Sequence, residues 1–155
     1  MDYQVLIVSR RDFGIRNALE HEGRISPGNI KEVKSVDDAV NALDDSAKKG
    51  TGVGAVIYNF GVDQDRIKQF RLLMQNVKAR QQPPAVIVTS IYNSKEPVQT
   101  SKGEIRQPAM SVAGAFLSEG AFAHLPIDAS PGMLSGFVKN ALKDYNMRIG
   151  QSGSQ

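Results

Sequence analysis

Short apolar runs alternate with amphipathic segments along almost the whole chain, and this alternation restricts the possible folds more than any other feature. The first run contains four consecutive aliphatic residues, Val5 to Val8. Continuous runs of this kind, rich in β-branched residues, are typical of strands that are buried on both faces. The alternation therefore predicts a parallel sheet whose two faces are covered by helices.

The pattern predicts five units, each made of a strand followed by a helix. The strands are expected at residues 3–8, 29–34, 54–58, 85–89 and 122–125. The charges around residues 31–34 are typical of an edge strand. The helices are expected from Asp12 as N-cap to about Gly23, at 36–47, 63–78 and 108–120, and from the start at 128–131 onward. Right-handed crossovers then favour a three-layer α/β/α sandwich with the flavodoxin-like strand order 2-1-3-4-5.

One domain is expected at residues 1–146, because 155 residues suffice for a single core. Residues 92–107 have no apolar period and are interpreted as a long exposed loop inserted into this domain. The Gly- and Ser-rich end at 147–155 is interpreted as a flexible tail or linker.

The composition excludes several classes of function. The chain has no cysteine, which removes disulfides and thiolate metal sites. The first residues do not form a secretion signal, and no apolar run is long enough to span a membrane, so a cytoplasmic location is expected. The 19 Lys and Arg residues are interleaved with 16 Asp and Glu residues, which does not favour a nucleic-acid partner.

Two further features do not point to a cofactor. The glycines between residues 50 and 54 precede a strand, whereas a dinucleotide-binding repeat follows one, so they are interpreted as a turn. His21 and His124 are isolated and have no Cys partners, so no metal site is expected.

Several segments, in order and at suitable spacing, resemble a response-regulator receiver domain over residues 3–145. They are the first strand, the fourth strand with its terminal Thr89 and Ser90, the Gly-Ala pair at 120–121 and the Leu-Pro pair at 125–126. The resemblance implies bacterial two-component signalling. It also implies contact with a protein partner, either a signalling or output protein or other domains of the same chain.

The resemblance also implies where a phosphoacceptor site would lie. Receivers hold Mg²⁺ with two carboxylates after the first strand and one Asp at the end of the third, and that Asp accepts the phosphoryl group. Here Ser9 and Arg10 replace the acidic pair, Asn59 replaces the nucleophile and Leu125 replaces a Lys, while Thr89 is kept. If the gap before the last strand is placed differently, Ile127 takes the Lys position.

These replacements predict a pseudo-receiver with a degenerate pocket, which is not an enzyme, needs no cofactor and works independently of phosphorylation. Arg10 or Arg11 is a candidate to occupy the place of Mg²⁺ and bond Asn59 and Thr89; in the alternative interpretation both arginines point into solvent. A phosphoacceptor role for Asp63 or Asp65, which follow the third strand, is the least favoured interpretation.

An alternative function is a sensor of a small anionic ligand, such as a nucleotide or cyclic dinucleotide. Arg10, Arg11 and Arg16 would line its pocket at the carboxyl end of the sheet, where such folds bind ligands. The competing interpretation is an unliganded vestige of the phosphorylation site.

Phe122 is interpreted as a core residue of the fifth strand. If it is instead a switch residue, it would couple Thr89 to the surface that receivers commonly present to partners. The apolar members of that partner face would include Met110, Val112 and Met133.

Overall fold

The computed structural model describes residues 4–9, 14–50, 52–60, 66–90, 98–99, 105–106, 120–126 and 130–153. Its five-stranded sheet contains β1 (Gln4–Val8), β2 (Ile30–Val33), β3 (Val53–Phe60), β4 (Ala85–Ser90) and β7 (Ala123–Pro126). All neighbours are parallel, in the order β2-β1-β3-β4-β7. This confirms the predicted order 2-1-3-4-5, with β2 at one edge as its charges indicated.

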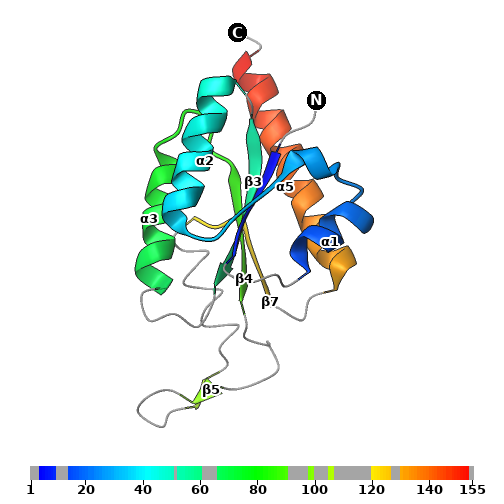
Figure 1. Cartoon of the computed structure of the whole chain (residues 1–155), viewed down its shortest axis with the longest axis vertical. Coiled ribbons are helices and arrows are strands. Elements are labelled where there is room, and N and C mark those ends of the chain that lie inside the picture. The colour runs from blue at the N-terminus through cyan, green and yellow to red at the C-terminus, as the bar shows by residue number, and fades with distance from the viewer. Residues whose placement is uncertain are drawn as a thin grey trace.

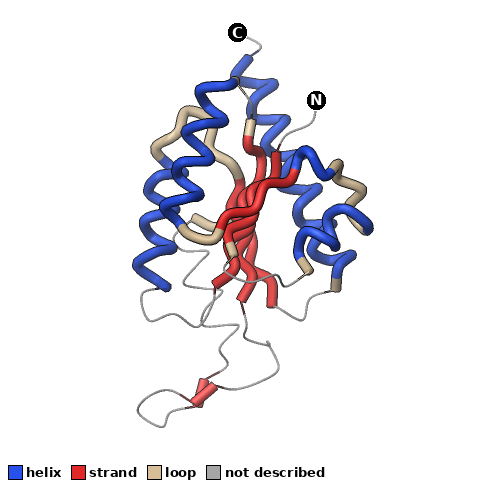
Figure 2. The backbone as a smooth tube through the Cα atoms, in the orientation of Figure 1, coloured by secondary structure: helices blue, strands red, loops and turns tan. Residues whose placement is uncertain are grey.

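Helices cover both faces of the sheet (Figures 1 and 2). One side carries α2 (Val36–Lys49) and α3 (Arg66–Lys78), and the other carries α1 (Ile15–His21) and α5 (Pro131–Gly153). Because side chains alternate along each strand, Leu6, Val56 and Val86 join the core under α2 and α3. Their neighbours, such as Ile7 and Ile57, join the core under α1 and α5.

Both boundaries of α2 follow local sequence signals. Ser35 caps α2 by accepting a hydrogen bond from the Asp38 N–H at 3.1 Å, and Gly50 ends this helix with a φ of 72°. The predicted N-cap at Asp12 is wrong, because Gly14 precedes α1 with a φ of 76°, which glycine adopts without strain.

Two expectations about irregular segments are also corrected. The segment 92–107, expected to be a loop throughout, contains the short strands β5 (Val98–Gln99) and β6 (Ile105–Arg106), which pair antiparallel. The segment from residue 147, expected to be flexible, continues α5 as far as Gly153. Arg148 supports this extension, since it bonds Asp144 at 3.0 Å and the Pro83 carbonyl at 3.1 Å.

The helix expected at 108–120 lies outside the described residues, except for Gly120. A 3₁₀ turn at Pro27–Asn29 precedes β2 and was not expected. No helix in the described part of the chain combines the length and hydropathy needed to cross a membrane.

Candidate functional site

Three of the predicted pocket residues meet at the carboxyl ends of adjacent strands. Ser9 directly follows β1, Asn59 is the penultimate residue of β3, and Thr89 is the penultimate residue of β4. Asn59 and Thr89 are register partners. All three pocket residues lie two residues after Ile7, Ile57 and Ile87, respectively, which pack under α1 and α5. Since side chains alternate along a strand, all three therefore point to that same face of the sheet.

The three side chains form a chain of hydrogen bonds. The Thr89 hydroxyl donates to Asn59 Oδ1 at 3.2 Å, and Asn59 Nδ2 donates to Ser9 Oγ at 3.1 Å. Thr89 is buried, while Ser9 and Asn59 are half-buried. Both ends of the Asn59 amide are therefore occupied by neutral partners from the two adjacent strands.

Leu125, which replaces the Lys of receivers in the predicted pocket, lies on the same side of the sheet as these three residues. It is the register partner of Thr89 on β7 and is buried in the core under α1 and α5. No charged group therefore stands at this place in β7. The preceding residue His124 does not supply a cation either, because burial lowers the pKa of its imidazole from 6.5.

Of the other residues proposed for this pocket, Arg10, Arg11, Asp63, Asp65 and Ile127 lie outside the described residues. Within the described part of the chain, no three His, Asp or Glu side chains are grouped so that they could hold a metal ion.

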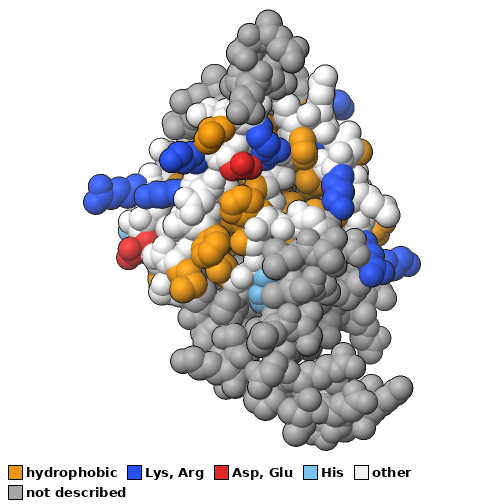
Figure 3. Space-filling model, turned by 180° about the vertical axis from the view of Figure 1, so that it is seen from behind, with side chains coloured by type: hydrophobic (Ala, Val, Ile, Leu, Met, Phe, Trp, Pro, Cys, Tyr) orange, Lys and Arg blue, Asp and Glu red, His pale blue; other side chains and the backbone are white. Residues whose placement is uncertain are grey.

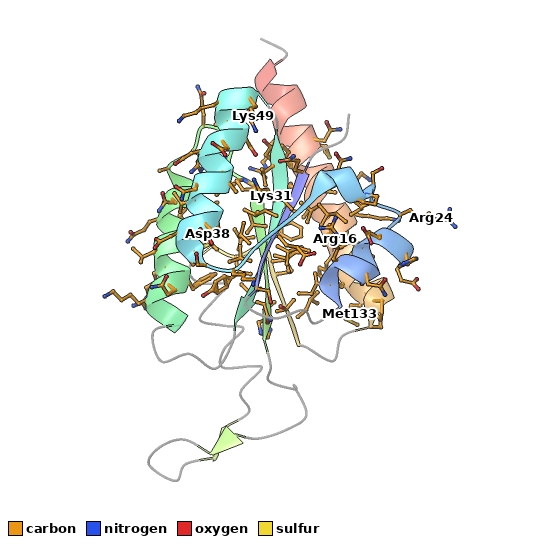
Figure 4. All side chains as sticks on the ribbon, in the orientation of Figure 1. Arg16, Arg24, Lys31, Asp38, Lys49 and Met133 are labelled. Atoms are coloured by element: carbon orange, nitrogen blue, oxygen red, sulfur yellow. The ribbon has the colours of Figure 1, made fainter. Side chains whose placement is uncertain are left out.

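Arg16 is described, and it reaches toward β2 instead of the Ser9–Asn59–Thr89 chain. Its guanidinium donates to Glu20 at 3.3 Å, Glu32 at 3.2 Å and the carbonyls of Pro27 and Ile30 at 3.2 and 3.4 Å. Figure 4 shows Arg16 on the side of α1. The i, i+4 spacing of Arg16 and Glu20 is visible in the sequence, but the contacts of Arg16 with Pro27, Ile30 and Glu32 depend on packing.

Two members of the predicted partner face are exposed. Met133 in the first turn of α5 is 49% exposed, and Phe122 just before β7 is 39% exposed. The interpretation of Phe122 as a core residue is thus wrong: its backbone N–H pairs with the Val86 carbonyl at 2.7 Å, but its ring is not enclosed. Met110 and Val112 lie outside the described residues.

Phe137 of α5 is also exposed, at 37%. It lies four residues after Met133, so the two share one face of the helix. Figure 3, which views the molecule from behind, shows hydrophobic side chains gathered on a surface that also carries Lys and Arg.

Solved structures of receiver domains share this arrangement of strands and helices. A signal receiver domain from Vibrio parahaemolyticus is 16% identical, with a TM-score of 0.69 and 99% of each chain covered. A LuxR family DNA-binding response regulator from Silicibacter pomeroyi is 20% identical, with a TM-score of 0.60, over 92% of this chain and 93% of that one. A response regulator from Thermotoga maritima is 14% identical, with a TM-score of 0.60, over 92% and 99%.

No protein-family model matches the chain, and neither does any curated protein. The likeness to the solved structures shows that the chain has the fold of response-regulator receiver domains.

Proposed function

We propose that this chain is a signalling adaptor of the two-component type, which acts through protein contact and independently of phosphorylation. The observation that carries the proposal is the hydrogen-bonded chain Thr89–Asn59–Ser9. Its members are the residues that we match to the phosphoacceptor site from the resemblance to receivers. A cytoplasmic, bacterial setting fits such a role.

Electrostatics supports this proposal. Phosphoryl transfer to a carboxylate needs a hard cation to neutralise the charge of donor and acceptor. An Asn amide is neutral and a poor nucleophile, and Ser9 contributes a hydroxyl in place of a carboxylate. Buried Leu125 contributes no positive charge. These three groups together remove the attraction for Mg²⁺ and for a phosphoryl donor.

The partner face that we propose combines Phe122, Met133 and Phe137, with Met110 and Val112 as further members. Exposed aromatic and Met side chains are enriched at protein interfaces. Phe122 is also close in sequence to Leu125, which is the register partner of Thr89. A partner bound there would contact the strand next to the polar chain.

The phosphorylation half of the proposal is tested by titrating the ¹⁵N-labelled chain with Mg²⁺ and beryllofluoride, an analogue of the phosphoryl group. We expect no saturable shifts in the amide signals of Ser9, Asn59 and Thr89. A Ser9→Asp/Asn59→Asp variant is the matched control, because it returns carboxylates to the two places. Saturable shifts in the unmodified chain would refute phosphorylation independence.

The alternative function, a sensor of a small anion, now depends on Arg10 and Arg11. Arg16 already has two carboxylate partners, Glu20 and Glu32. A thermal-shift screen with nucleotides and cyclic dinucleotides separates the two functions. A ligand present at about 100 times its dissociation constant adds roughly 2.7 kcal/mol to the free energy of unfolding.

A further inference from the structure

A cavity of about 540 Å³ opens at the amino ends of the strands, at the opposite end of the sheet from Asn59. Its walls come from the ends of α2 and α3, the start of β3, the segment before β4, and Tyr145 of α5. Figure 1 shows α2 ending and β3 beginning at this end of the molecule. The volume lies within the range of small-molecule sites, roughly 300–1,000 Å³.

Arg80 provides the positive charge of this cavity. It is the one Lys, Arg, Asp or Glu among the described residues that line the cavity, and its side chain is 20% exposed. Its Nη2 donates to Asp44 Oδ1 at 2.7 Å. Its Nε is buried and has no hydrogen-bond partner in the described part of the chain.

The Nε and Nη2 hydrogens of an arginine point in the same direction and match the two oxygens of one carboxylate. Asp44 uses only one of these two donors. A buried N–H without an acceptor is unfavourable, because it has lost its bonds to water. The edge of the guanidinium is therefore half-occupied, and the Asp44 side chain, which is 53% exposed, can move into solvent.

We propose that this cavity binds a small monocarboxylate, whose two oxygens replace Asp44 on the Nε–Nη2 edge of Arg80. Asn76, Gln81 and Gln82 also line this cavity, and side-chain amides of this kind suit an amide or hydroxyl on the ligand. Leu43 and Val53 provide apolar wall for its carbon skeleton.

A monocarboxylate fits this cavity better than a phosphate. Two helix carboxyl ends, those of α2 and α3, border it and place partial negative charge there. Lys48 and Lys49 in the last turn of α2 are exposed and do not line the cavity. Figure 4 marks the position of Lys49 at this end of the helix. One guanidinium balances one negative charge, but not two.

The test is a titration of the ¹⁵N-labelled chain with succinamate, followed at the Arg80 Nε–H signal and the backbone amides of Gly50 and Gly52. Succinamide, in which a neutral amide replaces the carboxylate, is the matched control ligand. We expect saturable shifts with succinamate and none with succinamide.

Two variants separate ligand binding from a purely structural ion pair. Asp44→Asn removes the competing carboxylate, so it should tighten succinamate binding by up to about fivefold, the equivalent of an exposed ion pair. Arg80→Lys keeps the charge but loses the paired donors, so it should weaken binding.

Three results would overturn the proposal: no saturable shift in the unmodified chain or in Asp44→Asn, an equal response to succinamide, or weaker binding to Asp44→Asn. The outcome is independent of the beryllofluoride titration, because the two sites lie at opposite ends of β3.

Discussion

Among the described residues, Asn59 has two side-chain hydrogen-bond partners, Ser9 just after β1 and Thr89 in β4. Its amide can accept from Thr89 and donate to Ser9 at the same time, which a carboxylate cannot do. At the scale of single residues, the amide thus links the ends of β1, β3 and β4 without a metal ion.

Replacing Thr89 by Val removes the donor but keeps the shape and the β-branched side chain. The acceptor Asn59 Oδ1 then loses this partner in a half-buried place, so we expect a loss of about 1 kcal/mol in the free energy of unfolding. Urea unfolding measures this loss. Thr89→Ser, which keeps the hydroxyl, is the control, and a Thr89→Val variant as stable as the unmodified chain would contradict the assigned hydrogen bond.

The sequence was sufficient to predict that Ser9, Asn59, Thr89 and Leu125 occupy neighbouring strand ends, since the strand order follows from the alternating pattern. It was not sufficient to predict which of them bond one another. It also did not reveal the ion pair between Arg16 and Glu32, because contacts between α1 and β2 depend on packing. The pair of Arg16 with Glu20, in contrast, has the i, i+4 spacing of one helix face.

At the scale of elements, the edge strand β7 contains a half-buried ionisable group, His124. Burial lowers the pKa of His124 below its ordinary value of 6.5. The unfolded chain therefore binds a proton more readily than the folded chain. The free energy of unfolding should be independent of this group above pH 6.5 and should fall as the pH is lowered through and below that value.

Urea unfolding at about pH 7.5 and about pH 5.5 measures this dependence. A His124→Gln variant should lose less stability between the two pH values than the unmodified chain. His21→Gln, which removes an exposed histidine at the end of α1, controls for loss of a histidine elsewhere. If His124→Gln has the same pH dependence as the unmodified chain, the protonation of His124 is not linked to folding.

The elements that the sequence predicted least well are those that depend on backbone geometry. Gly14 begins α1 through its positive φ, although Asp12 had the better side chain for a cap. The last turns of α5 form despite a Gly- and Ser-rich composition. These turns extend a long helix that is already formed, so they do not bear the cost of helix nucleation. Arg148 also holds the helix close to β4, because it donates a hydrogen bond to the Pro83 carbonyl.

At the scale of the whole molecule, the sheet separates two apolar cores and has two unlike edges. At the β2 edge, Glu32 forms an ion pair with Arg16 of α1, and Lys31 is exposed. The β7 edge has exposed Phe122 beside it, and α5 carries exposed Met133 and Phe137. The order of strands was predictable from the sequence, but the exposure of the two phenylalanines was not, because it depends on which neighbours enclose them.

This difference between the edges gives a prediction for the proposed protein contact. A photo-cross-linking residue in place of Met133 should form a specific cross-link to a second protein in native cells, whereas the same residue in place of Lys31 should not. Figure 4 marks both positions. Equal cross-linking from the two positions, or cross-linking from Lys31 alone, would refute the proposed partner face.

The continuous helix α5 has a further consequence. Its 23 residues extend over roughly 34 Å, and each residue turns the helix by about 100°. A reporter fused in helical register after Gly153 would thus acquire a defined rotational phase relative to the sheet. Adding or removing a single residue at the junction would rotate the reporter to another side of the molecule while hardly changing its distance.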